Sequence, residues 1–167
     1  SMRSHGWTRD VEGIYEEETD DFYEKYRFIL PGYNLRNQEL NSALGLCQID
    51  KLDGFVAQRR RNAELFKKLF ADDRRFIIQK EAGRSSWFAF TLICNEVNRM
   101  DVMRELARAG IEHRIITGGC FTEHDVIEYF DYEIHGNLHN AVYAHTQGFF
   151  VGNSHKDLTD ELLHLRE

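Results

Sequence analysis

The sequence predicts a mixed α/β fold of the α+β kind, with a short, largely antiparallel or mixed sheet covered on one side by helices. Two patterns predict it. Apolar residues recur at spacings of three and four over residues 37–70, which is typical of helices with one buried face. From residue 75 onward, short apolar runs typical of strands alternate with further helical patterns. The 167 residues are enough to bury a core, and the single proline argues against several linked domains.

Residues 3–30 contain little core-forming sequence, and we expect them to be the tail of something larger. The acidic run at 16–21 is expected to form a solvated loop or a short helix. In the aromatic run that follows it, Tyr26, Phe28 and Leu30 alternate along the chain, as residues on one face of a strand do.

Pro31 and Gly32 mark a turn before the stretch GYNLR at 32–36. We expect Asn34 and Arg36 to lie on this turn, at the start of the next helix. Backbone N–H groups and a guanidinium in that position favour an anion such as phosphate or carboxylate. The alternative is an ordinary loop with polar residues leading into a helix.

Residues 37–70 are predicted to be helical, and Leu44, Val56 and Phe66 lie on their apolar stripe. The three arginines at 59–61 fall largely on the other faces and are expected to be solvated. Further helices are predicted at 100–109, near 138–147 and from 157 onward, and strands at 75–79, 87–93, 111–116 and 149–151.

Charge and cysteine content exclude several classes of protein. A net charge of −7 argues against non-specific binding to nucleic acid, which needs a basic surface. No apolar run approaches the roughly 20 residues that span a bilayer, so no membrane partner is expected. The cysteines Cys47, Cys94 and Cys120 are widely spaced, which favours a reduced, cytoplasmic protein without a structural metal site.

Four stretches resemble one known family. They are residues 3–10 (RSHGWTRD), 32–36 (GYNLR), 43–52 (ALGLCQIDKL) and 110–114 (GIEHR), the last with a Gly-Gly loop behind it. Together they resemble the C-terminal portion of the DegT/DnrJ/EryC1/StrS family, the fold-type I, pyridoxal-phosphate-dependent sugar aminotransferases and their dehydratase relatives. The resemblance implies that residues 1–36 are left from an upstream large domain. Residues 37–167 would form the small C-terminal domain with its long linking helix.

The resemblance also implies an activity. The parent protein is expected to bind pyridoxal 5'-phosphate or pyridoxamine 5'-phosphate and to aminate a nucleotide-linked 4-keto-6-deoxyhexose for deoxyaminosugar or lipopolysaccharide biosynthesis. The alternative within the family is removal of the 3-hydroxyl, and a second alternative is a catalytically inactive dimerisation or binding module. The family's cofactor lysine lies upstream of this chain, and the covalent step needs an amine nucleophile. We therefore expect this chain alone to hold no catalytic residue, bind no cofactor and have no activity.

By the same resemblance, Asn34 is expected to reach the cofactor phosphate of the partner subunit in a homodimer. The diphosphate of a nucleotide sugar needs cations with the fork geometry of arginine. The candidates are Arg114 and, more weakly, Arg9 and Arg36. Surface or intramolecular ion pairs are the alternative for all three arginines.

The loop after the strand at 111–116 contains Gly118 and Gly119, which let a ligand approach the backbone. They could offer N–H groups to a sugar or phosphate oxygen, and a plain tight turn is the alternative. Cys120 beside them is expected to be buried or inert rather than reactive. The eight histidines fit no metal-binding motif, so no metal site is expected.

Overall fold

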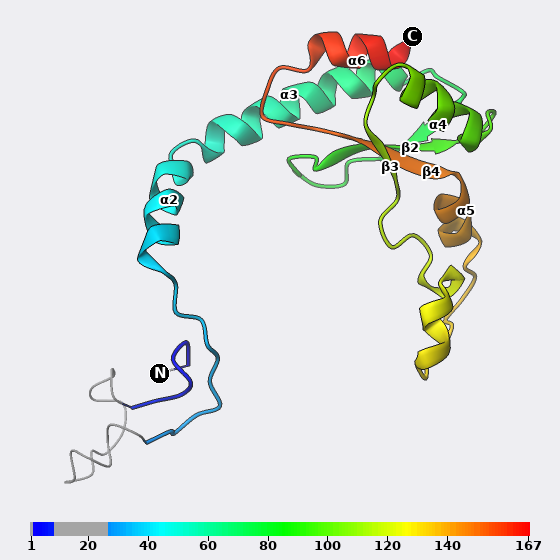
Figure 1. The fold of residues 1–167 in the computed structure, drawn as a ribbon. Coiled ribbons are helices and arrows are strands. Elements are labelled where there is room, and N and C mark those ends of the chain that lie inside the picture. The colour runs from blue at the N-terminus through cyan, green and yellow to red at the C-terminus, as the bar shows by residue number, and fades with distance from the viewer. Residues whose placement is uncertain (1, 9–26) are drawn as a thin grey trace. The chain divides into compact units, whose positions relative to one another are not determined.

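The computed structural model describes residues 2–8 and 27–167 (Figure 1). The acidic run at 16–21, Tyr26 and the candidate Arg9 lie outside the described residues. The chain divides into two compact units, Ser1–Asp50 and Lys51–Glu167, and each is described by itself. In the described residues, no helix combines the length and the apolar character needed to cross a membrane.

Residues 27–36 run beside residues 2–8 in the first unit. An isolated antiparallel bridge joins Ser4 to Asn34, and a second joins Trp7 to Phe28. Residues 33–35 are therefore paired with residues 2–5, and no turn lies within 32–36, where the sequence predicted one. Tyr33 and Leu35 form their backbone hydrogen bonds with residues 2–5 of the same chain and not within a tight turn.

The predicted helical region consists of two helices, α2 (Glu39–Ile49) and α3 (Leu52–Phe70). None of the residues of α2 is buried, although its sequence is apolar. Helix α3 buries Ala63, Phe66 and Phe70, at the spacing of three and four that predicted it. The apolar stripe thus marks a buried face only in α3.

The second unit is built on a four-stranded antiparallel sheet with strand order β1-β2-β4-β3 (Figure 1). The four predicted strands are confirmed, as β1 (Phe76–Ile78), β2 (Ala89–Cys94), β3 (His113–Ile115) and β4 (Gly148–Gly152). The predicted helices are α4 (Arg99–Arg108), α5 (His139–Gln147) and α6 (Thr159–Arg166). Two short 3₁₀ helices that the sequence did not predict are η1 (Phe121–Glu123) and η2 (Asp125–Tyr129).

The core lies between one face of this sheet and the helices α3, α4 and α6. The sheet contributes Phe90, Leu92, Phe149 and Val151, and the helices contribute Ala63, Phe66, Phe70, Leu106 and Leu162. Phe66 and Phe90 are both fully buried, and their rings stack with centroids 4.8 Å apart. Burial of large aromatic side chains supplies most of the stabilisation of such a layer. The prediction that helices cover one side of the sheet is confirmed.

A buried amide, Asn62, fastens the loop between β4 and α6 to helix α3. It is only 3% exposed. Its Nδ2 donates to Asn153 Oδ1 at 3.1 Å and to the carbonyl oxygens of Ser154 and Lys156 at 3.2 and 2.8 Å. Its Oδ1 accepts from the backbone N–H of Leu158 at 3.4 Å. Both ends of the amide are therefore satisfied inside the protein, as burial requires.

Arg59 and Arg60 of α3 hold the loop that precedes β2. Arg59 donates to the carbonyl oxygens of Ser86 and Trp87 at 2.9 and 2.7 Å. Arg60 donates to the carbonyl oxygen of Ser85 at 3.1 Å. The expectation of a solvated arginine run is wrong for these two half-buried residues, because carbonyl groups of the loop replace water around them. The third arginine of the run is exposed.

A buried carboxylate, Asp73, fastens the C-terminal helix. It accepts from Nε and Nη2 of Arg75 at 3.0 and 2.8 Å and lies 3.0 Å from Nη1 of Arg166. Arg166 also donates to the carbonyl oxygen of Leu69 at 2.9 Å. The hydrogen bonds from Arg75 lower the pKa of Asp73 from its ordinary value of 3.8, against the opposing effect of burial.

The first prediction concerns Asn62. Asn62→Leu removes the buried amide that holds the β4–α6 loop to α3, so we expect the free energy of unfolding to fall by about 3 kcal/mol. Urea unfolding at neutral pH measures it. Asn140→Leu, at an exposed position of α5, is the matched control and should change little. Equal stabilities of the two variants would contradict the assigned role.

The second prediction concerns pH. The pKa of Asp73 is lower in the folded protein than in the unfolded chain, so its contribution is present above pH 3.8 and is lost as the pH falls further. Asp73→Asn should lower the free energy of unfolding by about 2 kcal/mol near neutral pH, and by progressively less on acidification. Unfolding curves at several pH values measure this difference. Asp72→Asn, at the exposed neighbouring position, is the control. If Asp73→Asn lowered the free energy of unfolding by the same amount at every pH, this role of the Asp73 carboxylate would be refuted.

Candidate functional site

In the first unit, Asn34 lies in the middle of the paired stretch. The backbone on either side of it is held, because His5 N–H donates to the Tyr33 carbonyl and Leu35 N–H donates to the Arg3 carbonyl, both at 3.0 Å. The Asn34 side chain itself is exposed, and it makes no hydrogen bond to the part of the chain that the structure describes. The amide can therefore donate to an external acceptor from a fixed backbone.

Arg36 is tied to the same pair of segments. Its Nε and Nη2 donate to the hydroxyl oxygen of Ser4 at 3.0 and 2.8 Å. Ser4 is buried, so this contact helps to hold the two segments together. The third arginine expected at the site, Arg9, lies outside the described residues.

At Gly32, the first residue of the GYNLR stretch, the two segments approach each other closely. A Cβ on Gly32 would lie 2.1 Å from the backbone nitrogen of Gly6, and one on Gly6 would lie 1.8 Å from the Leu30 carbonyl oxygen. Gly6 also has a φ of +85°, a conformation that favours glycine. No side chain fits at either position without moving the backbone, which explains why glycine is needed there.

In the second unit, Arg114 lies on β3, opposite Phe150 of β4. Its Nη2 donates to Glu112 Oε1 at 2.9 Å, and the two side chains are 70% and 82% exposed. An exposed ion pair of this kind contributes about 0–1 kcal/mol. A diphosphate could therefore displace Glu112 at little cost, and the guanidinium is accessible to it.

Gly118 and Gly119 follow Arg114 in the loop after β3. Both have positive φ, +76° and +47°. A Cβ on Gly118 would meet open space, but one on Gly119 would lie 2.3 Å from Nδ1 of His145. The loop therefore contacts a histidine on α5 that the sequence analysis did not select. No local signal pointed to it, because 26 positions separate the two residues in the sequence.

Cys120 is 4% exposed, and its sulfur lies 3.1 Å from the hydroxyl of Thr122. The expectation of a buried cysteine is confirmed. Cys94 is also buried, which raises the pKa of its thiol, and Cys47 is exposed. Among the described residues, no three histidine, cysteine, aspartate or glutamate side chains converge as they would around a metal ion.

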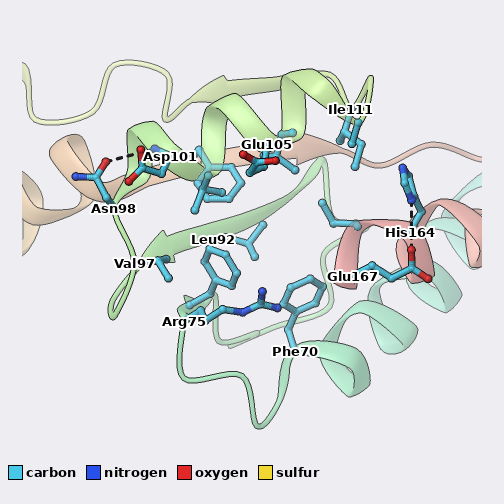
Figure 2. A pocket seen from close by; sticks show the side chains of 16 residues that line it. Phe70, Arg75, Leu92, Val97, Asn98, Asp101, Glu105, Ile111, His164 and Glu167 are labelled. Atoms are coloured by element: carbon cyan, nitrogen blue, oxygen red, sulfur yellow. Dashed lines mark hydrogen bonds and ion pairs between the residues drawn. The ribbon is translucent and has the colours of Figure 1, made fainter.

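Two cavities of the second unit could hold a small molecule. One, of about 510 Å³, has Phe70 and Leu92 among its lining residues (Figure 2). Figure 2 shows Glu105 of α4 on one side of it, and His164 of α6 and the C-terminal Glu167 on the other. No predicted site residue lines this cavity.

The other cavity has a volume of about 660 Å³ and is lined by Arg114 together with Gly110, Thr117, Phe150 and other residues. The predicted arginine therefore lines a cavity within the size range of small-molecule binding sites, about 300–1,000 Å³. Arg114 and Thr117, which precedes the two glycines, thus line one hollow of the second unit, whereas Gly118 and Gly119 are not among its lining residues. Asn34 and Arg36 belong to the first unit.

Comparison with protein families matches residues 1–164 to the DegT/DnrJ/EryC1/StrS aminotransferase family. Among curated proteins, the chain is 43% identical, over 99% of its length, to the GDP-4-keto-6-deoxy-D-mannose 3-dehydratase of Escherichia coli O55:H7. It covers 45% of that protein, so the chain spans less than half the length of this relative.

Solved structures of 3-dehydratases are also similar to the chain. Two crystal structures of GDP-4-keto-6-deoxymannose-3-dehydratase are each 42% identical to the chain, with TM-scores of 0.87 and 0.88. The chain is covered to 99% in both, and it covers 45% of each solved chain. One of these structures contains bound GDP-perosamine, and the other contains a trapped PLP-glutamate geminal diamine.

Proposed function

Because the chain belongs to the DegT/DnrJ/EryC1/StrS aminotransferase family, we propose that it is the C-terminal portion of a nucleotide-sugar 3-dehydratase. The substrate would be a GDP-linked 4-keto-6-deoxyhexose. The observation that carries this proposal is the 43% identity to a GDP-4-keto-6-deoxy-D-mannose 3-dehydratase across 99% of the chain. The sequence alone favoured amination and kept 3-dehydration as the alternative. The relatives reverse that order, because those named above are dehydratases.

The residues of this chain fit a role beside pyridoxal or pyridoxamine phosphate. When bound, such a cofactor acts as an electron sink for breaking a bond next to the substrate's carbonyl group. Asn34 is an exposed amide on a backbone held from both sides, so it can donate a hydrogen bond to a phosphate oxygen without rearrangement of its backbone. In a homodimer this phosphate would belong to the partner's cofactor. No residue of this chain is assigned the covalent step.

Arg114 is proposed to bind the diphosphate of the substrate. Its guanidinium is accessible and presents paired N–H groups, and its partner among the described residues is an exposed carboxylate, Glu112. Gly118 and Gly119 are proposed to bring backbone N–H groups to a sugar or phosphate oxygen near it. Arg36 is held by Ser4 and is proposed to support the segment that carries Asn34.

The third prediction tests this assignment in the full-length protein. Arg114→Ala removes a charge-assisted contact to the diphosphate, so we expect binding of GDP-perosamine to weaken by roughly 10- to 100-fold. Isothermal titration calorimetry measures it, and the absorbance of the bound cofactor should not change. Arg108→Ala is the matched control, since Arg108 is also exposed and also paired with a carboxylate, Glu105. Equal affinity of the two variants would remove Arg114 from the site.

A further inference from the structure

We propose that His145 is a positioning residue, which holds the Gly118–Cys120 backbone for nucleotide-sugar binding and does so only as a neutral imidazole. The part of this inference that concerns the nucleotide sugar rests on the proposed function. The part that concerns the loop rests on the contacts between α5 and the segment after β3.

The first contact is a hydrogen bond from the loop to the ring. The backbone N–H of Cys120 donates to Nδ1 of His145 at 3.3 Å. A ring nitrogen that accepts a hydrogen bond must keep its lone pair, so the proton of the neutral ring is on Nε2. An imidazolium ion carries N–H at both nitrogens and cannot accept this bond.

The second contact is steric. The backbone at Gly119 lies directly on the ring, because a Cβ there would be 2.3 Å from Nδ1 and 3.0 Å from Cγ of His145. The beginning of the loop is held at the same end of α5, where a Cβ on Gly148 would be 2.3 Å from Cδ1 of Ile116. The segment from Ile116 to Cys120 is therefore packed closely against this end of the helix.

A second histidine holds the other side of the loop. His124 Nε2 donates to the carbonyl oxygen of Gly118 at 2.8 Å, since a carbonyl can only accept. The rings of His124 and His145 meet edge to face, with centroids 5.4 Å apart. The two imidazoles thus hold the Gly118 carbonyl and the Cys120 amide. Within the described part of the chain, the N–H groups of Gly118 and Gly119 donate no hydrogen bond.

This arrangement gives the loop a chemical use. Two neighbouring N–H groups that donate to no described residue, on a backbone fixed at both ends, suit an anionic oxygen such as that of a phosphate. The loop follows directly after β3, which carries Arg114. A shift of the loop would therefore change the distance between these N–H groups and the guanidinium that is proposed to bind the same diphosphate.

Protonation of His145 should release the loop. Among the described residues, two charged or titratable side chains contact His145: His124, whose ring meets the imidazole, and Arg99 of α4, which donates to the His145 carbonyl oxygen. Arg99 Nη1 donates to the carbonyl oxygens of His145 and Gly148 at 2.7 and 3.3 Å, so a cation already lies at this end of α5. An imidazolium would turn an N–H toward the N–H of Cys120 and add a second positive charge.

The test compares three variants of the full-length protein by calorimetric titration with GDP-perosamine. His145→Leu removes the acceptor and should weaken binding by about fivefold to tenfold near pH 8. His145→Asn keeps an acceptor oxygen that cannot be protonated, and it should bind within about twofold of the unaltered protein. His139→Leu, at an exposed position of the same helix, is the control and should have no effect.

The pH dependence separates positioning from a merely structural role. On acidification from about pH 8 to about pH 5.5, the unaltered protein should lose more affinity for GDP-perosamine than His145→Asn. The inference is overturned if His145→Leu binds as tightly as the unaltered protein, or if His145→Asn binds as weakly as His145→Leu. An identical pH dependence of the unaltered protein and His145→Asn would also overturn it.

A second readout does not depend on the nucleotide sugar. In protein labelled with ¹⁵N at histidine and cysteine, NMR should show the proton of His145 on Nε2. The Cys120 amide signal should shift on acidification in the unaltered protein but not in His145→Asn. If GDP-perosamine does not bind, the proposed function fails, and if Arg114→Ala has no effect, only the role proposed for Arg114 fails. In either case the NMR result still decides the role of His145. A Cys120 signal that responds to pH equally in both proteins would refute it.

Discussion

The buried amide of Asn62 is the interaction on which the second unit most depends. A side chain that is 3% exposed must hydrogen-bond within the protein or cost free energy. It bonds to the loop after β4, and Asn153 of that loop donates on to the carbonyl oxygen of Trp87, just before β2. One connected set of hydrogen bonds therefore fixes α3, the end of β4 and the start of β2. Because β4 pairs with β3, it also fixes the strand that carries Arg114.

The elements that follow from an apolar pattern could be predicted from the sequence. The run at 87–93 became β2 because Phe90 and Leu92 alternate onto the face that the helices cover. The break between α2 and α3 could not be predicted, since residues 50–51 are aspartate and lysine, which interrupt no helix by themselves. The roles of Asn62 and Arg59 were also hidden, because a polar residue in a helix does not reveal a distant backbone partner.

The candidate site, like the fold, could be predicted from the sequence only in part. The GYNLR stretch and the glycine loop were visible in the sequence, but the physical reasons for their glycines were not. Gly32 is needed because Gly6, 26 positions earlier, lies against it, and Gly119 is needed because His145 does. Each reason is a contact between segments far apart in the chain. Such contacts have no local pattern, and the predicted turn at 32–36 was wrong because a paired neighbour extends it.

We propose that this chain supplies substrate and phosphate contacts to a full-length protein that removes the 3-hydroxyl of a GDP-linked 4-keto-6-deoxyhexose. The most direct test of this claim is the product of the full-length enzyme, incubated with GDP-4-keto-6-deoxymannose, pyridoxal phosphate and glutamate and identified by mass spectrometry. The account predicts a nucleotide sugar that has lost the oxygen at C3 and kept its keto group. A product with an amino group in place of the keto oxygen, or an unchanged substrate, would contradict it.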